Sequence, residues 1–394
     1  MKLRSHRQAK YKDKVVLYRA TYDITLAKRG NAWVVPDDTR IRETLPSLRW
    51  ILKQKPRAVV ILTWLGRPKR SGDPQYKLDP VAKRLSSLLH KPVKKLDQTV
   101  GPKVQEVIED AKAGSILMLE NVRFEKGEEN NSTAFAKALA ANADIMVNDA
   151  FGQCHRNVPS IVGVQKYLPS FAGPLLEKEV EMLDLVRKKP KRPLVAIMGG
   201  VKIGTRIGLI KYYLKHVDYL LLGGALSNTI LAVKGVQIGK SVQEPGVRSV
   251  VRGLNLMNKK LYIPIDVVTS TDAKGKGSLH RRPVGRVSKN EYILDIGPDT
   301  VALFSSIIRK ARMIVWNGPL GYTENKRFAY GTRSIALEMA KGKGETIVGG
   351  GDTLAILSQS HLLSKYDHVC TAGGAMLTYL EYGTLPGLKP LFTR

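Results

Sequence analysis

The sequence predicts an α/β protein made of two doubly wound parallel sheets joined by a helix. Short apolar runs recur along the 394 residues, and most are continuously apolar, as expected for strands buried on both faces of a parallel sheet. Amphipathic stretches with apolar residues three and four positions apart separate these runs, which gives the strand–helix–strand rhythm of such sheets. The length exceeds one ordinary core and suits two domains.

In the first half, strands are predicted at 15–18, 58–62, 115–119 and 145–147, and helices at 42–52, 80–89 and 135–141. A segment rich in Leu and Glu, 173–187, predicts a long helix, and the basic, proline-containing stretch after it is typical of a domain junction. In the second half, strands are predicted at 194–198, 219–222, 260–264, 313–316 and 345–348, and helices at 300–311 and 332–339. We therefore expect a first domain over 1–172, a linking helix over 173–187 and a second domain from residue 188.

The composition, 43% hydrophobic and 25% charged residues, is that of a globular protein. The two cysteines, Cys154 and Cys370, are far apart and lack the spacing of zinc ligands, so we expect neither a disulfide framework nor a zinc site. We also expect no secretory signal and no membrane span, because the first residues lack an apolar core and no apolar run is long enough. A reducing, cytoplasmic location fits these features.

The net charge of +30 concentrates anions near the surface, including phosphates and nucleic acid. The Lys and Arg residues are scattered, and their short runs are not interleaved with aromatic residues that could stack on bases. We read most of this charge as a solvated surface. Nucleic acid is expected only as a weak, nonspecific partner.

The run 348–355, Val-Gly-Gly-Gly-Asp-Thr-Leu-Ala, carries the most informative motif. Its three glycines let backbone amides approach an anion without Cβ obstruction, and Asp352 and Thr353 then begin a helix. An acidic residue at a helix start suits a metal cation bound to phosphate, so the run indicates a nucleotide with Mg2+. A glycine turn between a buried strand and a helix can also serve packing alone, and this alternative stays open.

Glycine turns follow other predicted strands of the second half: Gly199-Gly200, Gly223-Gly224 and Asn317-Gly318. The carboxyl ends of parallel strands share one edge of a sheet, where ligands bind. Lys202 lies just past the first pair, where its ammonium group could follow a phosphoryl group during transfer or could be an ordinary surface charge.

Arginines dominate the corresponding places in the first half. Each lies just after a predicted strand or in the loop beyond one, and they are Arg19, Arg40, Arg67, Arg123 and Arg156. Each alone could be a solvated arginine. Together they suggest a basic pocket for a small phosphorylated carboxylate.

Seven segments carry motifs that occur together in one known family: 37–42, 65–68, 119–124, 147–152 with His155-Arg156, 199–202, 315–319 with Glu324, and 349–353. In these motifs, in their order and across essentially the whole chain, the sequence resembles the phosphoglycerate kinase family. The resemblance implies two Rossmann-like domains, with 3-phosphoglycerate held by residues 1–172 completed by a returning tail, 371–394, and ATP or ADP held by residues 188–370. It implies reversible phosphoryl transfer between 1,3-bisphosphoglycerate and ADP, by a monomer.

The resemblance also implies a role for each matching residue. Arg40 and Lys202 would neutralise the phosphoryl group during transfer. The acid substrate would be bound by Arg19, Arg40, Arg67, Arg123 and Arg156, with Thr21, Asp23 and Trp64 in the same site. Asp352 would hold Mg2+, Glu324 the ribose, and Gly223 and Gly224 the adenine, and the remaining nucleotide contacts would come from Gly199, Gly200, Lys202, Arg206, Asn317, Gly349, Gly350, Gly351 and Thr353.

The chain departs from the family's pattern at several positions. Thr21, Asp23 and Trp64 replace an aspartate, an asparagine and a histidine on the acid side, and Thr205-Arg206 replaces an Asp-Lys pair. An indole has one donor and more bulk than an imidazole, and Arg differs from Lys in reach and geometry. A second interpretation therefore stays open: a catalytically impaired, kinase-like nucleotide-binding protein with incidental or acquired RNA binding.

Overall fold

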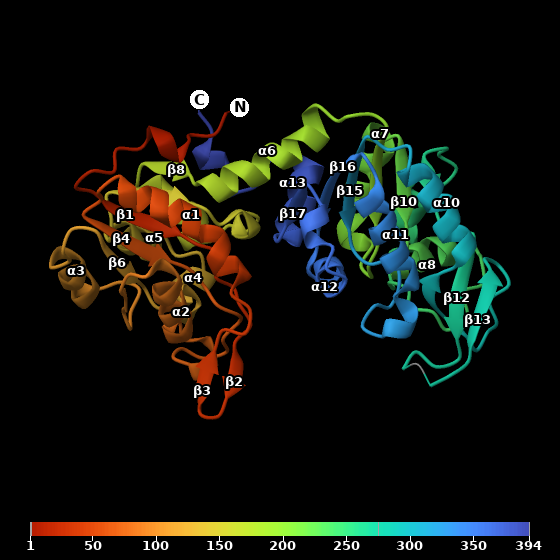
Figure 1. The fold of residues 1–394 in the computed structure, drawn as a ribbon, viewed down its shortest axis with the longest axis horizontal. Helices are drawn as coiled ribbons and strands as arrows, with labels where there is room; N and C mark the ends of the chain where they lie inside the picture. The colour runs from red at the N-terminus through yellow and green to blue at the C-terminus, as the bar shows by residue number, and fades with distance from the viewer. Residues whose placement is uncertain (1, 275, 394) are drawn as a thin grey trace. The chain divides into compact units, whose positions relative to one another are not determined.

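The computed structural model describes residues 2–274 and 276–393 and divides the chain into two compact units. Unit 1 comprises Met1–Glu181 and Thr384–Arg394, and unit 2 comprises Met182–Gly383. Residues 1 and 394, which bound the expected first domain, lie outside the described part. Each unit contains one six-stranded parallel sheet with helices packed against it, as Figure 1 shows. The predicted fold class is confirmed.

The sheet of unit 1 has the strand order β5-β6-β4-β1-β7-β8, with every neighbouring pair parallel. Its strands are β1 (Val15–Arg19), β4 (Ala58–Leu62), β5 (Val93–Lys95), β6 (Ser115–Met118), β7 (Ile145–Asn148) and β8 (Ser170–Ala172). Its helices are α1 (Thr39–Lys53), α2 (Asp79–Leu89), α3 (Pro102–Glu109), α4 (Lys126–Glu129) and α5 (Thr133–Ala140).

Helices cover both faces of this sheet. Val16 and Tyr18 of β1 belong to a core cluster shared with α1 and α2, whereas Val15 and Leu17 belong to a second cluster shared with α3 and α5. Successive strand residues point to opposite faces, so the continuous apolar run of β1 reflects burial on both.

The sheet of unit 2 has the order β11-β10-β9-β15-β16-β17 and is also fully parallel. Its strands are β9 (Leu194–Met198), β10 (Tyr219–Leu222), β11 (Leu261–Tyr262), β15 (Met313–Asn317), β16 (Glu345–Gly349) and β17 (His368–Cys370). Its helices are α7 (Ile207–His216), α8 (Gly224–Val233), α9 (Arg248–Arg252), α10 (Pro298–Ile308), α11 (Tyr330–Lys341), α12 (Gly351–Gln359) and α13 (Gly373–Tyr382). The strand order runs outward in both directions from β9 and β15, which makes the carboxyl ends of these two strands the topological switch point.

Two small antiparallel elements were not predicted. β2 (Ala27–Arg29) and β3 (Ala32–Val34) form a hairpin in unit 1, and β12 (Asp266–Ser270), β13 (Leu279–Pro283) and β14 (Tyr292–Ile296) form a three-stranded sheet in unit 2 (Figure 1). β13 alternates exposed and half-buried residues, so it lacks the continuous apolar run that marks the parallel strands.

The division between the units falls within the long helix α6 (Pro174–Lys188), at 181/182, and the chain returns to unit 1 at Thr384 instead of residue 371. α13 belongs to unit 2 because the Tyr379 hydroxyl donates to Asp184 Oδ1 at 2.8 Å and Arg187 donates to the Leu380 carbonyl. Past Gly383 the tail bonds in unit 1, where the Gly387 amide donates to the Cys154 carbonyl at 2.8 Å. In residues 2–274 and 276–393, no helix combines the length and apolarity of a membrane span.

Candidate active site

In unit 1 the predicted arginines gather at the carboxyl edge of the sheet. Arg19 ends β1, Arg67 follows β4, Arg123 lies in the turn after β6 and Arg156 lies in the loop after β7. These four strands are neighbours, so their carboxyl ends meet. Burial lowers the pKa of Arg123, the charge of Asp23 opposes this shift, and the nearby charges of Arg156 and Arg67 lower the pKa further. The like charges therefore lie close enough to repel one another, and an anion bound among them would relieve that repulsion.

Arg19, expected as a direct substrate ligand, is fully buried in the structure. Burial lowers its pKa to about 10, and the charge of Glu128 opposes this. Glu128 is itself buried and accepts from the Ser160 amide at 3.0 Å and the Ser160 hydroxyl at 2.6 Å. Arg19 thus belongs to a buried layer beneath the exposed Arg67 and Arg156.

Asp23 and Arg40 form a second part of this edge. One carboxylate oxygen of Asp23 accepts from the Gly66 amide at 2.8 Å, which holds the loop that carries Arg67. The Arg40 guanidinium, on α1, donates to the Asp23 carbonyl. Thr21 is half-buried in the same segment. Asp23 therefore has an evident task in this chain, because its carboxylate fixes an arginine-bearing loop.

Asn121 is a buried positioning residue that we did not predict. Its Oδ1 accepts from the amides of Leu65 and Arg123, both at 3.1 Å, and its Nδ2 donates to the carbonyls of Leu65 at 2.8 Å and Tyr76 at 3.0 Å. It ties the loop that carries Arg67 to the turn that carries Arg123. The motif 119–124 contains this asparagine and its local bond to the Arg123 amide, but the bonds to Leu65 and Tyr76 go to backbone atoms far away in sequence, and no local pattern reports them.

In unit 2 most of the predicted glycines allow loops to pack on one another. The Gly199 amide donates to the Asn317 carbonyl at 3.0 Å, and the Gly224 amide donates to the Leu320 carbonyl at 3.0 Å. A Cβ at Gly199 would collide with the Pro319 carbonyl, one at Gly223 with Leu320, and one at Gly349 with Met376. The packing alternative therefore accounts for these three glycines without a ligand.

Other groups at the same edge remain open to a ligand. Gly351 begins α12, is exposed, and has no heavy atom within 4 Å of the place its Cβ would take. Gly350 has φ +99° and lies against the Asn317 side chain. Asn317 is buried, and its Nδ2 has no hydrogen-bond partner among the described residues. An unpaired buried donor beside a glycine turn suits an acceptor from outside the chain.

Arg206 and Asp352 lie near this turn. The Arg206 guanidinium donates to the Gly199 carbonyl, and burial lowers its pKa while the charge of Asp352 opposes that shift. Asp352 is exposed in the first turn of α12. Arg206 follows β9, Asn317 ends β15 and Asp352 follows the neighbouring β16, so all three lie at the carboxyl edge of the sheet near the switch point, where a doubly wound sheet binds ligands.

The remaining predicted residues of unit 2 have different surroundings. Thr353 is buried, and its hydroxyl accepts from the Gly318 amide at 2.9 Å, so this oxygen already serves a loop contact. The Thr205 hydroxyl donates to the Lys202 carbonyl at 3.5 Å. Lys202 and Glu324 are exposed, and neither side chain has a hydrogen bond or ion pair within residues 2–274 and 276–393. Among the described residues, no hydrogen bond or ion pair therefore joins either side chain to Arg206, Asn317 or Asp352.

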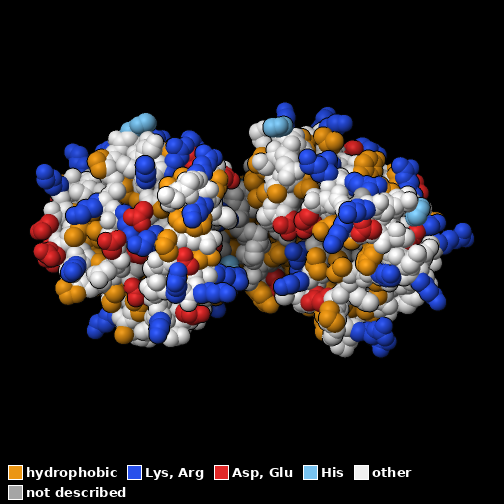
Figure 2. Space-filling view, turned by 90° about the horizontal axis from the view of Figure 1, so that it is seen from below, with side chains coloured by type: hydrophobic (Ala, Val, Ile, Leu, Met, Phe, Trp, Pro, Cys, Tyr) orange, Lys and Arg blue, Asp and Glu red, His pale blue; other side chains and the backbone are white. Residues whose placement is uncertain are grey.

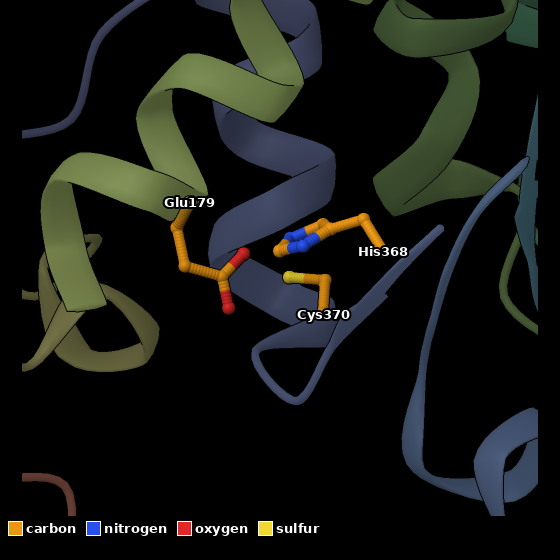
Figure 3. Close-up of side chains that lie close together, drawn as sticks. All are labelled: Glu179, His368 and Cys370. Atoms are coloured by element: carbon orange, nitrogen blue, oxygen red, sulfur yellow. The ribbon is translucent and has the colours of Figure 1, made fainter. Parts of the chain in front are cut away.

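The cysteines form no disulfide, as predicted. Cys154 is buried in unit 1, where burial raises its pKa to about 12. Cys370 lies on β17 of unit 2, two residues after His368, and Figure 3 shows both side chains on the same side of that strand.

A family model described as phosphoglycerate kinase matches residues 6–382. A phosphoglycerate kinase from Thermomicrobium roseum is 41% identical over 393 residues, 99% of each chain, and one from Dictyoglomus turgidum is 42% identical over 385 residues, 96% of each chain. Among solved structures, phosphoglycerate kinase from Coxiella burnetii has a TM-score of 0.86 at 36% identity, covering 99% of both chains. The Pyrococcus horikoshii enzyme has a TM-score of 0.84 at 28% identity, covering 99% of this chain and 98% of its own.

Proposed function

The chain belongs to the phosphoglycerate kinase family, and from this premise we propose how its two units divide the work of phosphoryl transfer. The reaction is the reversible transfer of a phosphoryl group between 1,3-bisphosphoglycerate and ADP, which gives 3-phosphoglycerate and ATP. The second interpretation, an impaired nucleotide-binding protein with RNA as a partner, gains no support from the relatives or the fold.

Unit 1 binds the acid substrate in this proposal. 3-Phosphoglycerate carries a phosphate and a carboxylate, and the planar guanidinium groups of arginine bind both by paired hydrogen bonds. Arg67, Arg123 and Arg156 are the contacting residues, since two are exposed and one is half-buried. Arg19, which is buried, would support these residues without contacting the substrate. The observation that carries this assignment is the gathering of four arginines from neighbouring strands at one edge.

Unit 2 binds the nucleotide at the switch point of its sheet. Asn317 Nδ2, the amides near Gly350 and Gly351, and the Arg206 guanidinium would donate to the phosphate chain. Glu324 would bond the ribose, and the turn at Gly223 and Gly224 would border the adenine. Gly199 and Gly349 support the edge through packing, and Thr353 supports it through Gly318. The unpaired, buried Asn317 donor is the strongest support for a ligand here.

Mg2+ bound with the nucleotide fits Asp352. The ion takes oxygen ligands and usually combines one or two carboxylates with substrate phosphates. Asp352 offers an exposed carboxylate without a hydrogen bond or ion pair among the described residues, at the start of a helix that follows an open glycine. The ion would supply charge neutralisation on the phosphates. Arg206 near this carboxylate would help to retain the metal-bound nucleotide through the phosphates.

Charge and position supply the catalysis in this proposal. The attacking oxygen of 3-phosphoglycerate belongs to a carboxylate, which is already ionised at neutral pH, so no general base is required. A new bond joins this oxygen to the γ-phosphorus of ATP while the bond to the ADP oxygen breaks. Arg40 and Lys202 would neutralise the transferred group, whose charge is spread over three oxygens in the transition state.

We extend the proposal to a cytoplasmic monomer that binds nucleic acid only weakly. The family supports the location, and the distribution of charge supports the last point. Figure 2 shows Lys and Arg spread over the visible face of both units and mixed with Asp and Glu, without one continuous basic patch. Such charge binds RNA without sequence preference and with steep salt dependence.

A coupled assay of the purified full chain tests the function directly. ATP formation from 1,3-bisphosphoglycerate and ADP should require Mg2+ and should fall by at least about tenfold in Arg67→Ala at subsaturating acid substrate. Absence of transfer in the unaltered protein, with tight RNA binding at physiological salt, would instead favour the second interpretation.

A further inference from the structure

Trp64 lies at the arginine-rich edge of unit 1 with only 3% of its surface exposed. Two guanidinium groups lie over its ring. The Cζ atom of Arg123 is 4.1 Å from the ring centroid, and that of Arg19 is 4.7 Å from it. Both distances are within the range of about 6 Å at which a cation is attracted to an aromatic face. One indole therefore interacts with two cations that come from different parts of the chain.

Arg19 has few other partners for its charge. One terminal nitrogen donates to the carbonyls of Ala20 at 2.6 Å and Leu62 at 3.4 Å, but Nε and Nη2 have no hydrogen-bond partner among the described residues. Within the same residues Arg19 also forms no ion pair. A buried cation without a paired anion is costly. The negative face of the indole is thus one of the few groups in contact with this guanidinium that favour its charge.

Arg123 shares this support and has a second task. It is half-buried, and its guanidinium donates to the Gly66 carbonyl, next to Arg67. A displacement of Arg123 would therefore also affect the loop that carries Arg67. The indole N–H of Trp64 has no hydrogen-bond partner among the described residues. Trp64 therefore interacts with the two arginines through the face of its ring.

We propose that Trp64 is a positioning residue, an aromatic platform that holds Arg19 in the buried layer and Arg123 in the layer that binds the acid substrate. The proposal rests on the proposed acid-substrate site in unit 1. It predicts that affinity for 3-phosphoglycerate depends on an aromatic face at residue 64 and not on the N–H group.

Two substitutions separate these properties. Trp64→Phe keeps an aromatic face and removes the N–H, whereas Trp64→Leu keeps an apolar side chain and removes the face. In steady-state assays of the full chain we expect Trp64→Leu to raise the KM for 3-phosphoglycerate about tenfold, because two cation–π contacts are lost. The KM for Mg-ATP should stay within about twofold, and Trp64→Phe should stay within about threefold of the unaltered protein for both substrates.

Fluorescence gives a readout that a merely structural role would not change. The chain has four tryptophans, and a bound anion that moves Arg123 should alter the emission of Trp64. Titration with 3-phosphoglycerate should change the emission of the unaltered protein, and this change should be lost in Trp64→Phe while affinity is kept. Trp50→Leu is the matched control, since Trp50 is a half-buried tryptophan of unit 1 that packs on His6 and Tyr11.

Arg67→Ala distinguishes failure of this inference from failure of the proposed function. If Arg67→Ala weakens binding of 3-phosphoglycerate and Trp64→Leu does not, the platform is wrong while the acid site stands. If neither changes binding, the acid site itself is wrong. Should Trp64→Leu fail to fold, Trp64→Phe still decides the matter, because a folded Trp64→Phe protein as impaired as Arg67→Ala would overturn the platform.

Discussion

At the carboxyl edge of unit 1 the sheet ends in charged side chains, and at the corresponding edge of unit 2 it ends in closely packed backbone loops. Unit 1 needs buried polar and aromatic groups, Asn121 and Trp64 among them, to hold its arginines in place. Unit 2 needs residues without a Cβ, such as Gly199 and Gly318, where loops touch through backbone atoms. The two edges are therefore sensitive to different kinds of substitution.

The largest effect is expected from Asn121→Ala in unit 1. The change removes hydrogen bonds to the Leu65 amide and carbonyl, the Arg123 amide and the Tyr76 carbonyl. Unsatisfied buried groups cost about 1–3 kcal/mol each, so the free energy of unfolding should fall by about 3 kcal/mol or more. Chemical denaturation measures this loss, and the KM for 3-phosphoglycerate should rise in the same variant.

Asn142→Ala is the control, because Asn142 is also buried in unit 1 but its side chain makes one hydrogen bond among the described residues, to the Thr99 carbonyl at 2.9 Å. The Asn142→Ala variant should lose some stability and keep its KM for 3-phosphoglycerate. A KM for 3-phosphoglycerate that stays unchanged in both variants would mean that Asn121 supports only the fold.

Lys202→Ala should lower turnover by roughly a hundredfold, about 2.7 kcal/mol, while the affinity for Mg-ADP changes little. The reason is that an exposed ammonium without partners in the described chain is free to follow charge as it develops. Pre-steady-state or steady-state kinetics combined with calorimetry separate the two effects. Retained turnover with collapsed nucleotide binding would instead make Lys202 a ground-state ligand.

Two glycines of unit 2 test whether the edge serves packing or ligand binding. Gly199→Ala should cost about 1–3 kcal/mol of stability, because the new Cβ meets the Pro319 carbonyl. In Gly351→Ala the new Cβ has no heavy atom within 4 Å, so stability should be unchanged or slightly higher. The affinity for Mg-ATP should fall if phosphate oxygens approach this backbone. Thermal unfolding and calorimetry on both variants give the comparison. A destabilised Gly351→Ala would contradict the open position of this residue.

The smallest effect concerns the unpredicted three-stranded sheet of unit 2. Buried Glu291 accepts from Arg282 at 2.9 Å, from His280 at 2.9 Å and from the Thr269 hydroxyl at 3.0 Å. The hydrogen bond from Arg282 is the main cause that lowers the Glu291 pKa to about 2, from 4.5. A carboxyl group whose pKa is lowered on folding stabilises the folded state at pH values above its unfolded pKa. That stabilisation is lost as the pH falls from about 4.5 towards 2.

Glu291→Gln should therefore cost about 1 kcal/mol near neutral pH and reduce the pH dependence of unfolding between about pH 4.5 and 2. Urea denaturation over this pH range measures both quantities. An unchanged pH profile would remove Glu291 from the groups that control acid stability.

The sequence predicted most of the parallel strands and the edge on which the site residues lie, because continuous apolar runs and glycine turns are local signals. β5, β8 and β17 were missed, since each has only three residues, too few for a continuous apolar run. The strand expected at 260–264 is shorter, Leu261–Tyr262, since Pro264 cannot donate to a ladder. β13 was missed because exposed and half-buried residues alternate along it, so it lacks a continuous apolar run. The burial of Arg19 and the bonds of Asn121 to Leu65 and Tyr76 were missed because they depend on contacts between distant segments. Likewise, no local signal separates Gly199, which packs, from Gly351, which is open.

The most direct test of the division of work between the units is a crossed calorimetric titration of the full chain. Arg67→Ala and Asp352→Ala would each be titrated with 3-phosphoglycerate and with Mg-ATP. We predict that Arg67→Ala weakens only 3-phosphoglycerate and Asp352→Ala weakens only Mg-ATP, each by at least about tenfold, or 1.4 kcal/mol. Loss of both ligands in either variant, with folding intact, would contradict separate binding sites in the two units.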